Sequence, residues 1–298
     1  MTNTAENMAT DAASQGIGPD GLGEAQKTNE WREFGAFLLK LALFMFVLRS
    51  FIISPFNIPS ESMQPRLLIG DYLLVAKWPY GYSNYSTSFG LPIIPGRIFA
   101  NQPKAGDVAV FKAPPTQRDD YIKRVIGLPG DIIQMREGNL EINGLAVKKE
   151  RVADLVIPVT QNMIEAARTE DDRDPCWRTE LHETVKGGGS VCRYPRYRET
   201  LPNGRSYEIV DTDIGSDADN KGPFVVPADH LFLMGDNRDH SADSRFPATE
   251  GGGIGIVPQK NLVGRALVTV FSTDGSARWL LPWTWFSAAR WDRIGHGF

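Results

Sequence analysis

The longest apolar stretch of the chain covers residues 34–53 and reads FGAFLLKLALFMFVLRSFII. About 20 apolar residues in a helix cross the hydrocarbon core of a bilayer, so this stretch predicts one N-terminal transmembrane helix. Arg49 lies near one end of the stretch, where its side chain can reach the polar interface. Lys40 lies deeper, where a cation costs about 2.5–3.5 kcal/mol.

Two alternatives to an anchor exist for residues 34–53. An amphipathic helix on a soluble domain would show a polar face, and this stretch has none. A cleavable signal would end in a small-residue site, whereas the chain continues directly into SPFN at residues 54–57. We therefore expect an uncleaved anchor. Residues 1–33 are rich in Ala, Gly, Asn, Thr and acidic residues and predict a disordered cytoplasmic tail.

Short runs rich in β-branched and aromatic residues follow, and each is bounded by Gly, Pro or Asp. The runs expected to be strands are residues 72–78, 107–112, 121–126, 131–135, 139–147, 230–234 and 264–271. Asn143-Gly144 predicts a hairpin turn, and a second hairpin turn is expected around residues 201–204. The fold class predicted from this pattern is mainly β, with an antiparallel sheet.

Residues 150–222 are more polar than the runs on either side and predict an inserted polar β subdomain. The main β domain is then formed by residues 54–149 and 223–275. Residues 276–298 make up a separate C-terminal segment in which arginines lie among tryptophans, which suits either a bilayer interface or a packed tail. Its tryptophans and arginines are Trp279, Trp283, Trp285, Trp291, Arg278, Arg290 and Arg293.

Composition narrows the possible partners of this chain. The 298 residues carry a net charge of −4 and hold no cluster of Lys and Arg, so a nucleic-acid partner is not expected. The charges that flank the apolar stretch are too few for the positive-inside rule to decide its orientation. The lipid bilayer is the partner that the apolar stretch predicts.

The two cysteines, Cys176 and Cys192, both lie in the polar insert. A disulfide between them would close a short loop, stabilise the fold by about 3 kcal/mol in the chain-entropy model, and suit an oxidising compartment. Two free thiols are the alternative, and the sequence leaves the choice open. The four histidines show no ligand spacing with each other or with the cysteines, so neither a metal nor another cofactor is expected.

Three polar segments stand out as candidates for chemistry. Residues 59–65 (PSESMQP) place Ser62 between prolines, where a serine is ordinarily a turn residue. Residues 121–131 (YIKRVIGLPGD) place Lys123 in an apolar strand; if it points inward, desolvation lowers its pKa and makes it a general base. Residues 235–245 (GDNRDHSADSR) form a dense polar loop that lacks the Gly and Glu of a calcium loop and is better suited to bracing a site.

These three segments, in this order, resemble the bacterial type I signal peptidases, and the resemblance covers roughly residues 35–275. It implies an enzyme that cleaves signal peptides from exported preproteins by a Ser–Lys acyl-enzyme mechanism. The nucleophile would be Ser62 and the general base Lys123. The supporting residues would be Ser60 as an oxyanion donor, Ser241 as a hydroxyl that orients the lysine, and Asp243 and Arg245 as an ion pair.

The same resemblance implies a preference for small residues before the cut, set by an apolar pocket. The pocket positions that it implies are Phe56, Ile58, Met63, Leu67, Val110, Tyr121 and Ile122. Two positions depart from the family pattern: Glu61 stands where glycine is common, and Arg66 where threonine or serine is common. Both change the charge next to the nucleophile.

The resemblance also implies a single-pass protein of the inner (plasma) membrane whose catalytic domain lies on the periplasmic, or extracytoplasmic, face. Two rival functions remain. One is a dedicated processing peptidase of the same clan that acts on a single pilus-type substrate. The other is a tethered, non-catalytic β protein that binds exported chains, and such a protein would need none of the four residues Ser60, Ser62, Lys123 and Ser241.

Overall fold

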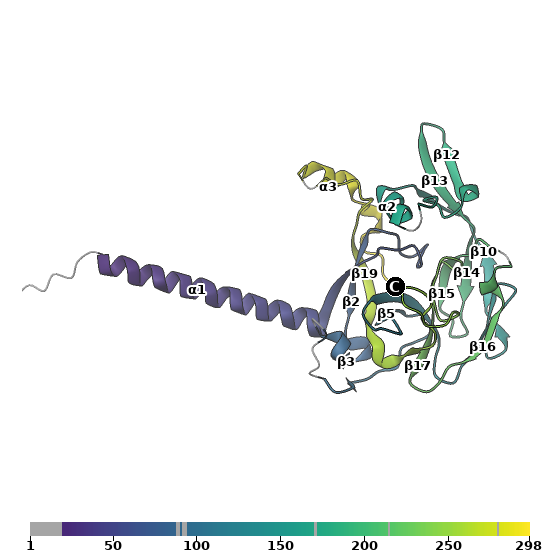
Figure 1. Ribbon diagram of the computed structural model, residues 1–298, viewed down its shortest axis with the longest axis horizontal. Coiled ribbons are helices and arrows are strands. Elements are labelled where there is room, and N and C mark those ends of the chain that lie inside the picture. The colour runs from purple at the N-terminus through teal and green to yellow at the C-terminus, as the bar shows by residue number, and fades with distance from the viewer. Residues whose placement is uncertain (1–19, 88–89, 91–93, 170–171, 214, 279) are drawn as a thin grey trace, which may run out of the picture. The chain divides into compact units, whose positions relative to one another are not determined.

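The computed structural model describes residues 20–87, 90, 94–169, 172–213, 215–278 and 280–298 (Figure 1). Two compact units divide the chain, one ending at Phe46 and the other covering Val47–Phe298. The first unit consists of the N-terminal helix. The second holds the sheets and every candidate site residue named above.

Helix α1 (Asp20–Val47) continues into a short π-helical segment, Leu48–Ile52. The part of these two segments from Glu30 to Ile52 is long and apolar enough to cross a membrane, with a mean hydropathy of 1.9 over its most apolar window. The predicted tail, residues 1–33, is helical from Asp20 onward, because Glu, Ala, Gln and Lys in this stretch are good helix formers. The rest of the tail, residues 1–19, lies outside the described residues.

A seven-stranded antiparallel sheet forms the centre of the second unit, and it confirms the mainly β prediction. Its strand order is β1-β2-β19-β5-β6-β17-β18, which places β19 between β2 and β5. The strands are β1 (Ile53–Asn57), β2 (Asp71–Ala76), β5 (Val108–Lys112), β6 (Asp120–Gly127), β17 (His230–Met234), β18 (Val257–Pro258) and β19 (Leu262–Ser272).

Gly264 allows β19 to lie close against β2. A Cβ at this position would stand 2.3 Å from the carbonyl oxygen of Ala76 and 2.7 Å from the Val75 side chain, both far inside contact distance. Buried residues of both strands pack with the loop that follows β1, in a cluster that includes Ile58, Leu73 and Val263. The core of the sheet therefore supports the loop that carries Ser62.

A second sheet has the order β16-β7-β8-β9, formed by Lys221–Val225, Ile132–Arg136, Asn139–Ile142 and Leu145–Ala146. The predicted turn Asn143-Gly144 joins β8 to β9, with φ of 55° and 77° at the two residues. Asn and Gly tolerate this left-handed backbone, which matches the twist of a two-residue hairpin.

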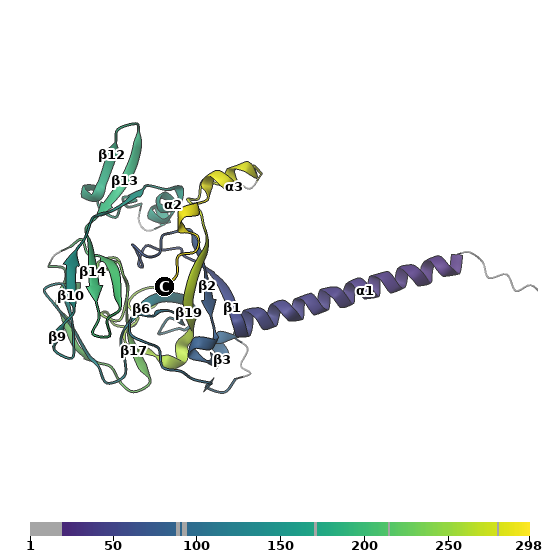
Figure 2. The same ribbon diagram turned by 180° about the vertical axis from the view of Figure 1, so that it is seen from behind.

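The insert folds into two three-stranded sheets and one helix. One sheet pairs β10 (Lys148–Arg151), β14 (Arg196–Thr200) and β15 (Ser206–Val210), and the predicted turn at residues 201–204 lies between β14 and β15. The other pairs β11 (Leu155–Pro158), β13 (Gly189–Tyr194) and β12 (His182–Val185). Helix α2 is Gln161–Thr169. Figures 1 and 2 both show the β12–β13 hairpin extending away from the other strands of this unit.

The remaining elements are short. They are the strands β3 (Tyr82–Ser83) and β4 (Arg97–Ile98), the helix α3 (Trp283–Ala288), and 3₁₀ turns at Trp78–Tyr80, Asn84–Ser86, Thr179–Leu181, Asp217–Asp219, Gln259–Asn261 and Trp291–Arg293. Around α3 several aromatic side chains are exposed, among them Trp283 at 67% and Phe286 at 70%. Trp279, expected to belong to this group, lies outside the described residues.

Candidate active site

Ser62 lies in the loop between β1 and β2 and is almost fully buried. The loop is fixed from the polar segment 235–245, because the backbone N–H of Asn237 donates to the carbonyl oxygen of Ser62 at 3.1 Å and the Asn237 side chain donates to that of Glu61 at 3.2 Å. Gly235 is required for this approach. A Cβ there would lie 2.5 Å from the Ser62 carbonyl oxygen and 2.2 Å from the Ser241 hydroxyl.

Lys123 extends from β6 toward Ser62, and its Nζ donates a hydrogen bond to Ser62 Oγ at 2.6 Å. The lysine is 4% exposed, so it points inward, as the candidate chemistry requires. Burial lowers the pKa of Lys123 to about 8, although the carboxylates of Asp243 and Asp236 act in the opposite direction. A substantial fraction of neutral amine is therefore present in mildly alkaline solution.

Ser60 lies in the same loop, where it is exposed and lines the cleft. Its Oγ is 3.4 Å from Ser62 Oγ. A hydroxyl in this position can donate to an oxygen that lies next to the Ser62 nucleophile. Ser241 is buried, and its hydroxyl helps to hold the pKa of the Asp243 carboxyl below its usual value. Ser241 also lines the cleft, and its role in orienting Lys123 stays a prediction.

Asp243 and Arg245 form a fully buried, two-pronged ion pair, with Nε–Oδ1 and Nη2–Oδ2 distances of 2.8 Å. Asp243 also accepts the backbone N–H of Gly235 at 3.0 Å. Burial raises the pKa of the Asp243 carboxyl, but the Arg245 guanidinium outweighs it and holds that pKa below its usual value. The pair stabilises the loop at the glycine that touches Ser62.

Two further buried ion pairs attach this loop to its surroundings. Arg124, the neighbour of Lys123 on β6, pairs with Asp236 through its Nε at 2.7 Å. Arg238 pairs through both of its terminal nitrogens with Glu199 of β14, in the insert. Polar residues of segment 235–245 thus connect the main sheet to the insert, in agreement with the bracing role predicted for this segment.

A cleft of about 710 Å³ opens over Ser62 and Lys123. Five of the seven predicted pocket residues line it, namely Phe56, Ile58, Val110, Tyr121 and Ile122. The other two, Met63 and Leu67, are 1% and 0% exposed and pack in the core beneath the loop, outside the lining of the cleft. Both follow Ser62 along the turn of the loop that faces the sheet.

The insert contributes to this cleft in a way that the sequence did not reveal. Arg173, Trp177 and Ala166 line it. Arg173 Nη2 lies 2.6 Å from Glu61 Oε1, and His240 Nδ1 lies 3.3 Å from the same oxygen. Burial alone would raise the pKa of Glu61, but His240 and Arg173 hold it below its usual value. Glu61 was recognised only as a departure from the family pattern, and no signal in the sequence linked it to Arg173.

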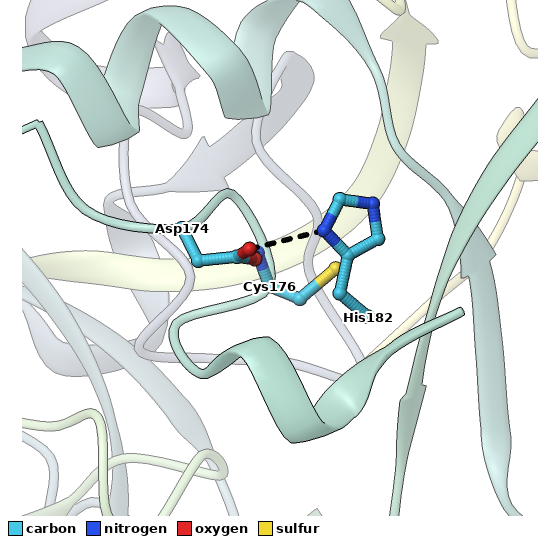
Figure 3. A group of neighbouring side chains, drawn as sticks. All are labelled: Asp174, Cys176 and His182. Atoms are coloured by element: carbon cyan, nitrogen blue, oxygen red, sulfur yellow. Dashed lines mark hydrogen bonds and ion pairs between the residues drawn. The ribbon is translucent and has the colours of Figure 1, made fainter. Parts of the chain in front are cut away.

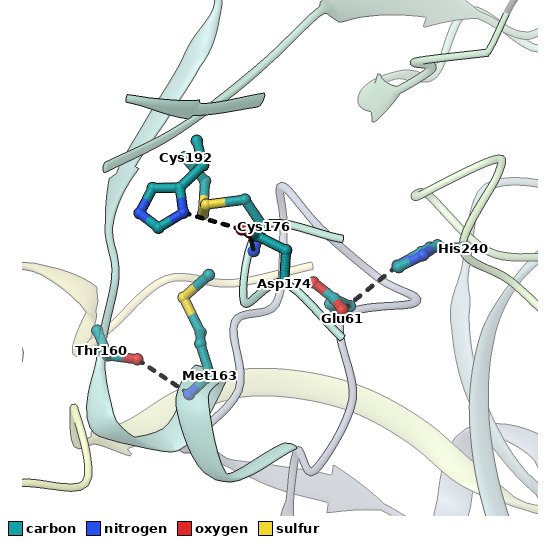
Figure 4. Close-up of a disulfide and its surroundings, with 8 residues drawn as sticks. Glu61, Thr160, Met163, Asp174, Cys176, Cys192 and His240 are labelled. Atoms are coloured by element: carbon teal, nitrogen blue, oxygen red, sulfur yellow. Dashed lines mark hydrogen bonds and ion pairs between the residues drawn. A yellow bond between two sulfur atoms is a disulfide. The ribbon is translucent and has the colours of Figure 1, made fainter. Parts of the chain in front are cut away.

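A disulfide joins Cys176 to Cys192 in the segment that carries Arg173 and Trp177 (Figure 4). The bridge attaches that segment to β13. Asp174, Cys176 and His182 lie close enough to form a metal-binding group (Figure 3). The sulfur of Cys176 is bonded to Cys192 and is no free thiolate ligand, and His182 Nδ1 lies 3.0 Å from Asp174 Oδ2, so the two remaining side chains pair with each other.

This chain is similar to several known proteins. The family model described as "Signal peptidase, peptidase S26" matches residues 31–271. Signal peptidase I of Rickettsia typhi is 35% identical over 260 residues, which are 83% of this chain and 83% of that protein. Signal peptidase I of Rickettsia conorii is 37% identical over 252 residues, covering 82% and 79%. A crystal structure of signal peptidase I from Enterococcus faecalis matches with a TM-score of 0.27 at 21% identity, covering 55% of this chain and 97% of that one.

Proposed function

This chain belongs to the signal peptidase family of peptidase S26 and is a serine endopeptidase that cleaves signal peptides from preproteins, and on this premise we propose that Ser62 and Lys123 carry out the cleavage. The observation that carries the assignment is the 2.6 Å contact between Lys123 Nζ and Ser62 Oγ in a desolvated position that opens into a cleft.

In the first half of the reaction, the neutral amine of Lys123 accepts the proton of Ser62 as Oγ attacks the scissile carbonyl carbon. The oxyanion of the tetrahedral intermediate accepts hydrogen bonds from the Ser60 hydroxyl and the Ser62 backbone N–H. When the C–N bond breaks, the Lys123 ammonium gives its proton to the departing amine. The mature protein leaves, and the signal peptide remains as an ester on Ser62.

In the second half, Lys123 is neutral again and accepts a proton from a water molecule that attacks the ester. The C–Oγ bond breaks, Ser62 regains a proton from Lys123, and the signal peptide leaves with a new carboxylate. The supporting side chains position this dyad. Asp243 and Arg245 fix Gly235 against Ser62, and Ser241 lies beside it at the cleft.

Substrate selection follows from the apolar side of the cleft. Phe56, Ile58, Val110, Tyr121 and Ile122 approach the position of the scissile bond. These side chains leave room for small residues before the cut, which is the A-x-A pattern of signal peptides. Enlarging the pocket with Ile122→Ala should admit a preprotein with valine before the cut, measured as the ratio of kcat/KM for valine and alanine substrates.

We further propose that Glu30–Ile52 spans the inner membrane and that the second unit lies on the extracytoplasmic face, where preproteins emerge. The Cys176–Cys192 disulfide suits that oxidising side. The exposed aromatic residues around α3, including Trp283 and Phe286, are suited to the bilayer interface. Protease added to spheroplasts should degrade the chain beyond residue 55; protection of that part would overturn the orientation.

The test of the site uses the full chain in detergent with a purified preprotein. Ser62→Ala should abolish cleavage while the thermal unfolding midpoint stays near that of the wild type. Rapid denaturation during turnover of the wild type should leave the signal peptide attached to the tryptic peptide that contains Ser62, detected by mass. An active Ser62→Ala variant, or attachment to a different peptide, would refute the assignment.

A further inference from the structure

A second cavity, of about 460 Å³, lies outside the active cleft and is rich in arginine. Its walls come from segments that are distant in sequence: the turn after the nucleophile, β6, the β14–β15 hairpin and the C-terminal segment. We call it the arginine pocket. Its charged and aromatic lining consists of Arg66, Arg124, Arg196, Arg198, Arg293, Glu208, His296, Tyr207 and Phe298.

The positive charge of the arginine pocket is only partly balanced. Arg124 pairs with Asp236, and Arg293 pairs with Asp71. Arg196 and Arg198 share Glu208, at 2.8 and 3.1 Å. Arg66 has no carboxylate partner among the described residues, and its guanidinium lies over the Phe298 ring at 5.4 Å.

Five guanidinium groups thus face three carboxylates, which leaves an excess of two positive charges. The excess falls on Arg66 and on the Arg196–Arg198 pair.

The excess positive charge affects the pKa of Arg66. Partial burial, together with repulsion from Arg124 and Arg293, lowers the pKa of its guanidinium, and attraction to Asp236 and Glu208 does not offset this. Two lining side chains, Arg124 and Tyr207, are more than nine-tenths buried and stack, with the guanidinium 4.3 Å from the ring. The pocket is therefore a formed cavity with fixed walls, in which a bound anion would relieve the repulsion.

The geometry points to a phosphate-bearing anion as the occupant: we propose that the arginine pocket binds a phosphate monoester or diester. Guanidinium groups are planar forks that match phosphate oxygens two at a time. The cavity is larger than a lone phosphate needs, and the rings of Tyr207 and Phe298 offer an apolar surface to an organic substituent. A phospholipid headgroup and a soluble phosphate ester share this chemistry.

Binding is measured on the full chain in uncharged detergent micelles. Inorganic phosphate is titrated at constant ionic strength against chloride, and the unfolding midpoint is followed by tryptophan fluorescence. A saturable rise with phosphate and none with chloride is expected. The double variant Arg66→Gln/Arg198→Gln should weaken the apparent affinity about tenfold or more, since it removes the two least-compensated guanidinium groups.

The matched control is Arg193→Gln, an exposed arginine of the same insert that pairs with Glu183 outside the pocket. It should respond to phosphate like the wild type. Equal responses in the double variant and the wild type, or equal effects of phosphate and chloride, would overturn the proposal. Both variants change exposed side chains, and preprotein cleavage in the same samples shows that they are folded.

Reconstitution distinguishes the two sources of phosphate. If a lipid headgroup occupies the pocket, vesicles that contain phosphatidylglycerol should raise the midpoint above that in pure phosphatidylcholine for the wild type but not for the double variant. Added phosphate should then have no further effect. If the ligand is soluble, phosphate should raise the midpoint equally in both kinds of vesicle. If the unfolding midpoint of the wild type changes neither with phosphatidylglycerol nor with phosphate, the proposal is contradicted.

Discussion

The main sheet and the insert both line the active cleft, but they hold their side chains there by different means. Lys123 lies on β6, where the register with β5 places it opposite Ala109 and the sheet fixes its direction. Arg173 lies between α2 and β12, outside any strand, and is held by its ion pair with Glu61 and by the nearby disulfide. The general base is therefore placed by regular structure and the insert's part of the cleft wall by long-range contacts, which makes the two regions respond differently to substitution.

The largest effect is expected from the lysine of the main sheet. Lys123→Met should lower kcat about 10⁴-fold or more, because the Ser62 proton then has no acceptor. Lys77→Met is the matched control. Lys77 is also buried, and burial lowers its pKa to about 8, but its Nζ lies over the Phe56 ring at 5.6 Å, whereas that of Lys123 donates to Ser62.

The Lys123→Met and Lys77→Met variants are compared by their rates of preprotein cleavage at saturating substrate concentration. Lys77→Met should cleave near the wild-type rate, since an apolar side chain replaces a buried cation at little cost. If both lysine variants lose activity equally, burial of a lysine and not its contact with Ser62 is what matters, and the special role of β6 is lost.

Ser60 should show the next largest effect. Ser60→Ala removes one donor to the developing oxyanion and should lower kcat about 10²–10³-fold while KM changes little. Ser60→Thr keeps the hydroxyl and should recover part of the loss. Single-turnover measurements of acyl-enzyme formation test this directly, and an unchanged acylation rate in Ser60→Ala would exclude the hydroxyl as a donor.

A smaller effect on kcat is expected from a substitution in the insert. Arg173→Met removes the nearer of the two partners of the buried Glu61 carboxylate, one residue from Ser62. A displacement of the nucleophile should lower kcat about ten- to a hundredfold. Because the cause is a buried carboxylate that has lost part of its charge compensation, the double variant Glu61→Gln/Arg173→Met should recover most of the activity.

The control for this pair is Arg178→Met. Arg178 lies in the same insert and pairs with Asp213 at 2.5 Å, but it does not line the cleft. It should leave kcat unchanged. Failure of Glu61→Gln to rescue Arg173→Met would mean that the insert acts on the cleft by shape alone.

The disulfide should give the smallest change in rate. Cys176→Ser/Cys192→Ser should lower the free energy of unfolding by about 2–4 kcal/mol, because the unfolded chain regains loop entropy. Its kcat should fall only a few-fold, since the Glu61–Arg173 ion pair remains. Denaturant unfolding and preprotein cleavage measure the two effects. A loss of rate greater than that of Arg173→Met would show that the bridge positions more than this arginine.

The difference between side chains placed by a strand and side chains placed by long-range contacts also explains which site residues the sequence could predict. Lys123 stands in the run YIKRVI, and its role could be proposed because the resemblance supplied an inward direction that strand periodicity alone leaves open. The sequence left the direction of Met63 and Leu67 open, because an apolar residue near the nucleophile can face either the cleft or the core, and the loop turns both toward the core. The Glu61–Arg173 contact joins residues 112 positions apart through an insert that matches the family only loosely, so no local pattern could reveal it.

The measurement that tests the central claim most directly is the pH dependence of kcat/KM for the full chain in detergent. A free lysine has a pKa of about 10.4 and is protonated at neutral pH, when it cannot accept the Ser62 proton. Burial lowers the pKa of Lys123 to about 8, so the neutral form appears, and the rate should rise, as the pH passes through that value. The rate should fall about tenfold for each pH unit below it and level off above it. A profile that rises only around pH 10 would show that Lys123 is solvated and would contradict its role as the general base.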